Sequence, residues 1–328
     1  MNIYTDKDVD QSILEGRRIV VVGYGNQGRP QSMNLRDSGF DVSVAVRGGG
    51  AGSERAAADG FTVLDIGAAA READVLLLLV PDEVHGSLFE TEIAANLRPG
   101  ATLCFAHGFS VAFGEIESSD YDLVLVAPKG QGQRLRDSYC EGSGLPCLVA
   151  VERDVSGRAL EIALAIAGGL GCLRVGAFET TFREEAVSDL FGEQAVLCGG
   201  VPALIKCAFD ILVRRGFSPE VAYFECFHEL KIIVDLFADL GFSGMRDLIS
   251  GTAAYGSLRY GEDVIAGNVT EEMEKLFTRI ESGEFAERWL HQSRAASQEL
   301  ERLREAERNS LIEEVGDRVR RMFPPRRQ

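Results

Sequence analysis

The sequence predicts an α/β fold with two domains, a doubly wound parallel sheet over residues 1–180 and an all-α domain over residues 181–328. Two observations predict it. Short runs rich in Val, Leu and Ile alternate with helical segments as far as about residue 178, and strand-like runs nearly vanish after residue 180. A chain of 328 residues is long enough for two domains with cores of their own.

Six runs in the first half are predicted to be strands buried on both faces, because they are apolar and most lack polar alternation. They are RRIVVVG, DVSVAV, DVLLLLV, ATLCFA, DLVLVAP and LPCLVAV. Helical segments fill the gaps, among them QGRPQSMNLRDSG and two Ala-rich segments near 54–59 and 67–73. This alternation predicts a parallel sheet with helices on both of its faces.

The second half shows helical periodicity alone. The predicted helices are 183–198, 200–215, 218–240, 271–281, 284–306 and 309–321. The basic C-terminal sequence RVRRMFPPRRQ ends in prolines and arginines, and we expect it to be a frayed end.

Charge limits the possible partners. The formal net charge is −17, from 51 acidic and 34 basic residues. Nucleic acids and anionic membranes both require a positive surface, so neither is expected as a partner. An acidic chain is compatible with divalent cations, although solubility alone would also explain the charge.

The cysteines and the N-terminus indicate a protein of the reducing cytoplasm. No C-x-x-C pair occurs, and several cysteines sit in apolar runs, so we expect buried free thiols and no disulfide frame or zinc site. The N-terminus MNIYTDKDVD is polar and acidic, unlike a signal peptide. We expect no apolar run to approach the roughly 20 residues of a membrane helix.

A glycine-rich turn follows the first predicted strand. Gly23, Gly25 and Gly28 form G-Y-G-N-Q-G, with Tyr24, Asn26 and Gln27 between them, and a helical segment follows. In this context the first glycine permits the turn, the second lets backbone approach a pyrophosphate, and the third lets helix pack on strand. The motif predicts a Rossmann-like dinucleotide site; the alternative is a glycine turn without a ligand.

The residue after the second strand indicates which cofactor binds. An acid there would favour NAD, and an arginine would favour NADP. Arg47 occupies this position, with Ser53 and Arg55 close behind, and the sequence therefore favours NADPH. Glu54 and the neighbouring glycine run leave NADH possible. Pro81, after the third strand, and Gly132 complete the predicted cofactor-binding residues.

Two carboxylate pairs occur in the helical half. Asp189 and Glu193 are four residues apart, as are Glu225 and Glu229, so each pair shares one helix face without a basic neighbour in register. Unpaired carboxylates beside apolar residues are costly unless a cation neutralises them. The pairs predict Mg²⁺, one ion or two; the alternative is ordinary surface acids.

Two more polar residues follow predicted strands. His107 comes after ATLCFA and Lys129 after DLVLVA. Ligands of open α/β sheets bind beyond the carboxyl ends of the strands, so we expect both to face the nicotinamide. A capping or surface role is the alternative for each.

Several motifs together resemble the ketol-acid reductoisomerase (acetohydroxy-acid isomeroreductase) family in its short form, over nearly the whole chain. They are GYGNQG…NLRDSG at 23–39, FAHGF at 105–109, APKGQG at 127–132, FREEAVSDLFGEQAVLCGG at 182–200, YFECFHELKIIVDL at 223–236 and ISGTAAYG at 249–256.

The resemblance implies a soluble Mg²⁺- and NADPH-dependent enzyme of branched-chain amino-acid biosynthesis with a knotted helical domain. It shifts an alkyl group in a 2-aceto-2-hydroxy acid and then reduces the new ketone, giving a 2,3-dihydroxy acid. Asp189 would bridge two ions and Glu193 would bind one, while Glu225 and Glu229 would come from the other subunit of an interlocked homodimer. Glu229 would transfer protons.

The resemblance also implies that Ser250 contacts the substrate and that His107 and Lys129 lie in the active site. The chain departs from the usual family pattern around the ligands. Arg29 and Pro30 stand in the phosphate loop, and Gly251 and Ala254 replace an amide and a carboxylate beside the substrate serine. These changes leave two alternatives open: a divergent reductase acting on a 2-keto acid or cyclic imine without the alkyl shift, and a non-catalytic dinucleotide-binding subunit.

Overall fold

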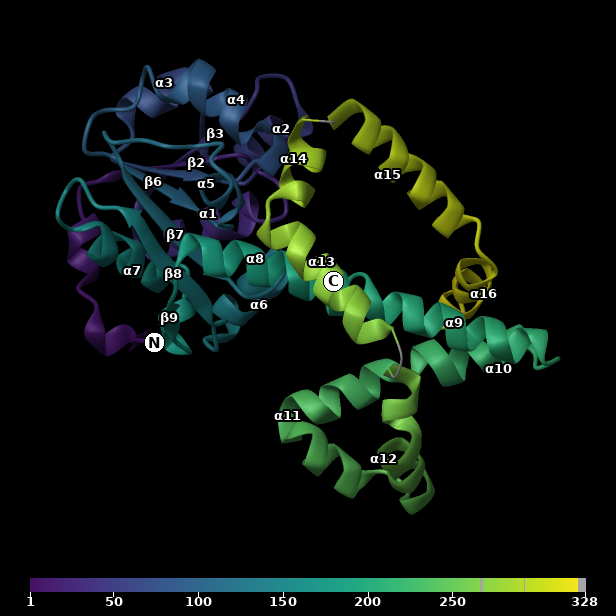
Figure 1. Cartoon of the computed structure of the whole chain (residues 1–328). Helices are drawn as coiled ribbons and strands as arrows, with labels where there is room; N and C mark the ends of the chain where they lie inside the picture. The colour runs from purple at the N-terminus through teal and green to yellow at the C-terminus, as the bar shows by residue number, and fades with distance from the viewer. Residues whose placement is uncertain (266–267, 292, 324–328) are drawn as a thin grey trace. The chain divides into compact units, whose positions relative to one another are not determined.

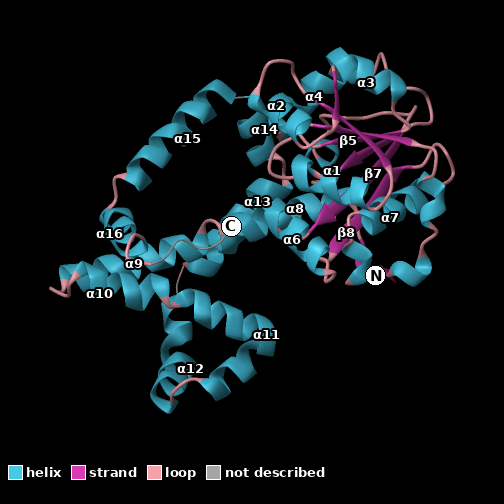
Figure 2. Cartoon of the chain, turned by 180° about the vertical axis from the view of Figure 1, so that it is seen from behind, coloured by secondary structure: helices cyan, strands magenta, loops and turns pink. Residues whose placement is uncertain are grey.

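The computed structural model describes residues 1–265, 268–291 and 293–323. The chain forms two compact units, Met1–Ser188 and Asp189–Gln328, and the division falls inside helix α8 (Phe182–Gly192). In the described part of the chain, every strand belongs to the first unit, and the second consists of helices and connecting loops (Figure 2).

The first unit is built on a nine-stranded sheet with the order β1-β9-β8-β7-β6-β5-β2-β3-β4. The strands are β1 (Ile3–Tyr4), β2 (Arg18–Val22), β3 (Asp41–Ala45), β4 (Thr62–Leu64), β5 (Val75–Leu78), β6 (Thr102–Phe105), β7 (Asp122–Pro128), β8 (Cys147–Arg153) and β9 (Ala177–Glu179). All six predicted strands are confirmed. The three that the sequence did not reveal have only two or three residues each, which is too short for a periodic signal.

The sheet is mixed, not wholly parallel. The strands from β4 to β7 in the sheet order are parallel, whereas β8 runs antiparallel to β7 and β1 antiparallel to β9. The prediction of a parallel strand was wrong for β8. Its sequence LPCLVAV is as apolar as its neighbours, and apolar content reports burial, not strand direction.

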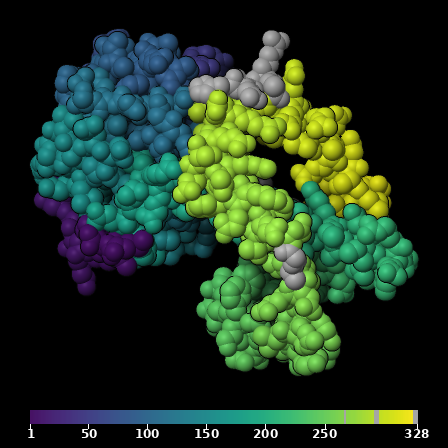
Figure 3. Space-filling view, viewed as in Figure 1, coloured from purple at the N-terminus to yellow at the C-terminus, as the bar shows by residue number. Residues whose placement is uncertain are grey.

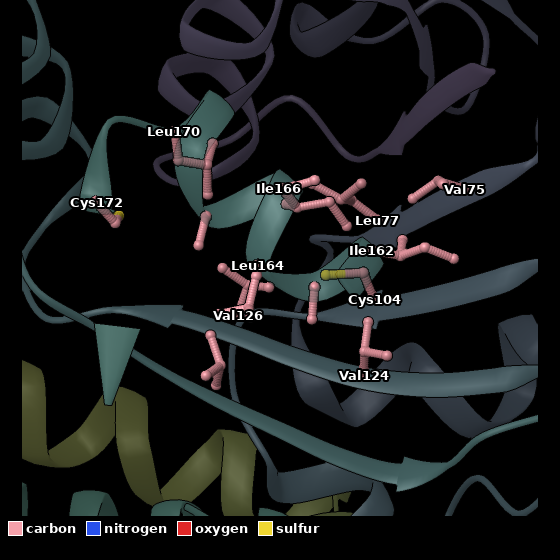
Figure 4. Close-up of a cluster of buried hydrophobic side chains, with 14 of the residues drawn as sticks. Val75, Leu77, Cys104, Val124, Val126, Ile162, Leu164, Ile166, Leu170 and Cys172 are labelled. Carbon is pink, nitrogen blue, oxygen red and sulfur yellow. The ribbon is translucent and has the colours of Figure 1, made fainter. Parts of the chain in front are cut away.

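Alternate residues of each strand enter two separate cores. Ile19 and Val21 of β2 face one core, and Val20 and Val22 face the other. The first core is covered by α1 (Gly28–Asp37), α6 (Gly132–Glu141) and α7 (Ala159–Gly169), as the close-up of α7 against the central strands shows (Figure 4). The second core is covered by α3 (Ile66–Glu72), α4 (His85–Leu88) and the π-helical η4 (Phe89–Ile93). Helices on both faces make this a doubly wound Rossmann-like unit, and Ala56 of α2 (Ala51–Ala58) shares a small core with Val44 of β3.

The helical unit follows the predicted segments with one addition. After α8 come η6 (Glu193–Leu197), α9 (Gly200–Arg214), α10 (Pro219–Tyr223), η7 (Phe224–His228), α11 (Leu230–Leu248), α12 (Gly251–Ile265), α13 (Val269–Glu281), α14 (Glu284–His291), α15 (Ser293–Arg308) and α16 (Leu311–Arg320). Helix α12 was not predicted. Gly251, Gly256 and Gly261 interrupt its pattern, and glycine weakens the helical signal.

Helix α11 contains a break at Gly241, whose φ of 72° and ψ of 171° lie outside the helical region. This break agrees with the predicted end of the helical pattern at residue 240. Within the helical unit, α9, α10 and α16 share a core around Phe209, Tyr223 and Val315. Helices α11 and α12 form a separate lobe of this unit, coloured green in Figures 1 and 3. Part of the basic tail, residues 324–328, lies outside the described residues.

Two expectations need correction. The helical stretch Phe182–Arg214 spans 33 residues and has the length and composition of a membrane-crossing helix, contrary to the expectation from apolar runs alone. The cysteines also differ from one another. Cys104, Cys147 and Cys172 are buried as expected, but Cys140, Cys198 and Cys207 are exposed. Apolar neighbours in the sequence did not predict the burial of these cysteines, because some apolar helix faces of this chain are exposed.

Candidate active site

The predicted site residues of the first unit follow neighbouring parallel strands. The glycine turn follows β2, Pro81 follows β5, His107 follows β6 and Lys129 follows β7. Because β2, β5, β6 and β7 are parallel, their carboxyl ends lie at one edge of the sheet. The strand order reverses between β2 and β5, and this switch point is where open α/β sheets bind ligands.

The glycine turn is held by close backbone contacts. A Cβ atom on Gly23, whose φ is 100°, would lie 2.5 Å from the carbonyl oxygen of Leu79. A Cβ on Gly28 would lie 2.1 Å from the carbonyl oxygen of Gly23. Gly25 has no atom within 4 Å of its Cβ position, so one face of the turn is open. Gly23 and Gly28 therefore have no room for a side chain, and the backbone at Gly25 is accessible, which is compatible with the roles predicted for the three glycines.

A cavity of about 460 Å³ opens over this face of the turn. Its lining consists of Gly25, Asn26, Arg29, Pro30, Met33, Arg55, Gln131, Gly132, Gln133 and Arg136. The start of α6 closes against the turn, since a Cβ on Gly132 would lie 1.7 Å from the carbonyl oxygen of Asn26. The cavity therefore combines the starts of α1 and α6 with three guanidinium groups, which suits an anionic ligand.

The other predicted cofactor residues have different environments. The Tyr24 ring is buried and packs edge-on against Phe61 at 5.7 Å, so only its backbone faces the turn. Gln27 donates a 3.2 Å hydrogen bond to the carbonyl oxygen of Gly130. Arg47 is exposed in the loop after β3, and Ser53 is half-buried on α2; neither lines the cavity.

A buried carboxylate that sequence reasoning missed lies beside Lys129. Glu185 on α8 is 1% exposed. Its Oε1 accepts a 2.8 Å hydrogen bond from Lys129 Nζ, and its Oε2 accepts a 2.7 Å bond from the backbone N–H of Gly108. Gly108 can approach α8 this closely because a side chain there would lie 2.4 Å from the carbonyl oxygen of Phe182. Glu185 thus connects the loops after β6 and β7.

His107 lies between two carboxylates. Its Nδ1 is 3.5 Å from Asp82 Oδ2, and its Nε2 is 3.8 Å from Glu185 Oε2. The ring stacks on Phe109 with centroids 6.0 Å apart. Asp82, which follows Pro81, is a second residue that the sequence did not single out.

Buried His85 links two of the loops at this edge of the sheet. Its ring nitrogens contact Ser110 Oγ at 2.7 Å and the carbonyl oxygen of Val80 at 2.9 Å, which joins the loops after β5 and β6. Burial lowers the pKa of His85, with Asp82 acting in the opposite direction. Its polar contacts are thus made by a neutral ring, and its role is structural.

Asp189 follows Glu185 by one turn of α8. One ligand atom from each of His107, Glu185 and Asp189 lies within 4.8 Å of the other two. Two carboxylates and an imidazole can hold a divalent cation, although Lys129 competes for Glu185. Asp189 is therefore the member of this cluster best suited to a hard cation, because both Glu185 oxygens already accept hydrogen bonds from Lys129 and Gly108.

The remaining predicted ligands lie elsewhere in the helical unit. Glu193 is the first residue of the π-helical turn η6. Glu225 lies within the π-helical turn η7, and Glu229 is the residue that follows this turn. All three are exposed, and they do not belong to the ligand cluster found among the described residues. π-Helical turns within helices occur frequently at functional sites, so both pairs share an uncommon backbone feature.

Ser250 begins α12. Its Oγ accepts a hydrogen bond of 3.1 Å from the backbone N–H of Ala253, and the residue is exposed. In the single chain it therefore caps a helix.

Glu185 could have been identified from the sequence, because Glu185, Asp189 and Glu193 follow one another at four-residue spacing. Asp82 carried no comparable signal.

Comparison with known proteins covers both units. Residues 13–176 match the family model described as "Acetohydroxy acid isomeroreductase, NADPH-binding domain". Residues 182–325 match that described as "Ketol-acid reductoisomerase, C-terminal domain". A solved NADH-preferring ketol-acid reductoisomerase from an uncultured archaean is 42% identical, with a TM-score of 0.95 over 99% of this chain and 100% of that chain.

More distant structures share the fold alone. A semialdehyde dehydrogenase NAD-binding protein from Cupriavidus necator is 20% identical, with a TM-score of 0.60, covering 80% of this chain and 99% of that chain. A putative oxidoreductase from Jannaschia sp. is 16% identical, with a TM-score of 0.61, covering 81% of this chain and 96% of that chain.

Proposed function

The chain belongs to the ketol-acid reductoisomerase family and is an oxidoreductase with a nicotinamide cofactor; from that premise we propose how its residues serve the reaction. The substrate is a 2-aceto-2-hydroxy acid, which undergoes an alkyl shift and then reduction to a 2,3-dihydroxy acid. The observation that supports this assignment is the Lys129–Glu185 pair, in which the lysine after β7 bonds to a buried carboxylate one helical turn before Asp189.

We propose that the cofactor is NADPH, with its pyrophosphate over Gly25 and Asn26 and its ribose phosphate near Arg47, Ser53 and Arg55. The open face of Gly25 and the arginine-lined cavity support the pyrophosphate position. Arg47 supports NADPH. The 42% identical relative prefers NADH, so NADH is the alternative cofactor, and comparing the two is part of the test.

We further propose that Asp189, Glu193, Glu225 and Glu229 hold two Mg²⁺ ions. The proximity of Asp189 to two further ligand groups supports a cation at this end of α8. When bound, Mg²⁺ supplies Lewis-acid polarisation of the substrate's hydroxyl, carbonyl and carboxylate oxygens. The carboxylates of this chain neutralise the ions and fix their position.

The remaining groups act on the substrate and its protons. Lys129, oriented by Glu185, presents a fixed positive charge to the substrate's oxygens. Glu229 would take the proton of the substrate hydroxyl as the alkyl group migrates and return it to the alkoxide formed at the former carbonyl. A second proton, drawn from solvent, would neutralise the alkoxide that reduction of the new ketone generates. Ser250 would hydrogen-bond the substrate, and His107, whose two ring nitrogens face Asp82 and Glu185, would lie beside the nicotinamide.

We propose that the active unit is a homodimer in the cytoplasm, with Glu225 and Glu229 donated by the second subunit. Exposed apolar side chains support a partner surface on the helical unit; they include Leu197, Ile232, Phe242, Leu248, Tyr255 and Leu258. Dimer burial of this surface would also explain why Phe182–Arg214 is apolar without spanning a membrane.

The test is a direct assay. With Mg²⁺ and NADPH, we expect oxidation of the cofactor with 2-acetolactate and conversion to the dihydroxy acid. Simple 2-keto acids serve as the comparison substrates. Oxidation with a 2-keto acid but not with 2-acetolactate would contradict the proposal, because it would show reduction without the alkyl shift.

A further inference from the structure

Arg29 is held in one orientation by Asp59. Arg29 is the second residue of α1, and Asp59 directly follows α2. The Arg29 Nε donates to Asp59 Oδ2 at 2.7 Å, and its Nη2 donates to Oδ1 at 3.1 Å. This side-on pair uses two of the three guanidinium nitrogens and leaves Nη1 directed away from the carboxylate.

Asp59 is itself tied to its surroundings. The Tyr24 hydroxyl donates to Oδ2 at 2.8 Å, and Arg36 donates to the Asp59 backbone oxygen at 2.7 Å. Arg36 also lies over the Phe61 ring at 4.2 Å. The hydrogen bonds from Arg29 chiefly lower the pKa of Asp59, so its carboxylate is ionised at neutral pH. Arg29 is therefore anchored to a rigid group.

Arg29 lines the cavity over the glycine turn, together with Gly25 and Asn26. The other two guanidiniums of this cavity are engaged differently. Arg136 bonds to Asn34 Oδ1 at 2.8 Å and pairs with Asp37 at 2.5 Å, and Arg55 donates to a carbonyl oxygen of its own helix. Since Asp59 balances the charge of Arg29, what Arg29 offers a ligand is two oriented N–H donors.

We propose that Arg29 donates hydrogen bonds from Nη1 to the pyrophosphate of the nicotinamide dinucleotide, and that Asp59 is the residue that positions it. This rests on the proposed cofactor site. The pyrophosphate is the partner because Arg29 lies in the first turn of α1, where the glycine turn meets that group. The ribose phosphate is expected after β3. Of the three residues proposed to bind it, Arg55 lines this cavity, whereas Arg47 and Ser53 do not.

The test measures cofactor affinity, not turnover. Dissociation constants of NADH and NADPH are measured by nicotinamide fluorescence for the full chain and for Arg29→Gln, Asp59→Asn and the double variant. We expect Arg29→Gln to weaken both cofactors by the same factor, about tenfold. Asp59→Asn should weaken both by a smaller factor. The double variant should match Arg29→Gln, because Asp59 acts through Arg29.

Two controls separate positioning from general damage. Arg158→Gln removes an exposed arginine that pairs with Glu161 and does not line the cavity, so it should leave both dissociation constants unchanged. Adenosine, which has no phosphate, should compete equally well for wild type and Arg29→Gln. Equal loss of adenosine and cofactor affinity would show a structural effect and overturn the proposal.

Three other outcomes also overturn it: unchanged affinity in Arg29→Gln, a loss confined to NADPH, or additive losses in the double variant. A loss confined to NADPH would place Arg29 at the ribose phosphate instead. If the wild-type chain binds neither NADH nor NADPH, the proposed cofactor site fails before the variants are compared, which distinguishes that failure from failure of the Arg29 contact.

Discussion

The Lys129 ammonium lies 2.8 Å from Oε1 of Glu185, a carboxylate that is 1% exposed, while the lysine side chain remains 35% exposed. The other carboxylate oxygen accepts the Gly108 N–H. Both oxygens of a buried acid are thus satisfied, and the lysine sits on the side that solvent reaches. The pair fixes a positive charge at the end of β7, and its partner on α8 is one turn from Asp189.

Replacing Lys129 with Met should destabilise the protein, because Glu185 would lose its charged partner while staying buried. We expect a loss of about 1–3 kcal/mol in the free energy of unfolding, measured by urea denaturation. The double variant Lys129→Met, Glu185→Gln should recover part of this loss but no activity. Lys206→Met is the matched control, since Lys206 pairs with Glu307 where both side chains are largely exposed. An equal loss in both single variants would contradict the argument.

Asp189→Asn should abolish turnover and leave NADPH affinity nearly unchanged. The substitution removes a charge from the proposed cation site, and we expect kcat to fall about a hundredfold or more. Steady-state kinetics and fluorescence titration of NADPH measure the two effects separately. Asp210→Asn changes an exposed acid on α9 in the same chemical way and should keep full activity. Substantial isomerisation by Asp189→Asn would rule out a role for this carboxylate in binding the metal.

The sheet could be predicted from sequence because its strands are buried on both faces. Runs such as VLLLL carry that burial in their composition, and the glycine turn marks where the first of them ends. The direction of β8 could not be predicted, since composition is the same for either direction. Helix α12 was missed because its glycines lower helix propensity, while its tertiary context keeps it helical.

The sequence indicated candidate site residues where a residue type and its position together suggest chemistry. His107 and Lys129 were proposed because they follow strands, and Asp189 was proposed from its spacing to Glu193. Asp82 and Asp59 were not found, because an acid in a loop or at a helix end is common. Their importance depends on which residues the fold brings to them, His107 and Arg29, and these partners are distant in sequence.

Arg47→Ala should weaken NADPH far more than NADH. Arg47 is exposed after β3, where the ribose phosphate is expected, and NADH lacks that phosphate. We expect the dissociation constant of NADPH to rise about tenfold, the size of one charged hydrogen bond, with little change for NADH. Arg153→Ala, an exposed arginine at the end of β8, is the control. Equal responses of both cofactors would show that Arg47 does not contact the phosphate.

Two inactive variants should restore activity when they share a dimer. If Glu225 and Glu229 act across the interface, a dimer of one Asp189→Asn subunit and one Glu229→Gln subunit contains one intact site. Co-expression with two different affinity tags should give about a quarter of wild-type activity in a random mixture of dimers. Mixing differently tagged Asp189→Asn subunits is the control and should stay inactive. If the mixed dimer is equally inactive, both carboxylate pairs belong to the same subunit.

Stability should fall as the pH drops below that at which free histidine titrates, because of His85. Burial lowers the pKa of His85 below its usual value of about 6.5. Between that value and the lower pKa of the folded state, the unfolded chain binds more protons, so the free energy of unfolding decreases as the pH falls and levels off below the folded pKa. Asp82 and Glu83 oppose this effect and His107 adds to it.

Urea denaturation from pH 7.5 to pH 5 should therefore show a steeper loss of stability for wild type than for His85→Gln. Ser110→Ala removes a hydrogen bond to the ring but keeps the imidazole, so it should lower stability and retain the pH dependence. Parallel pH profiles for wild type and His85→Gln would show that the folded state does not disfavour protonation of His85.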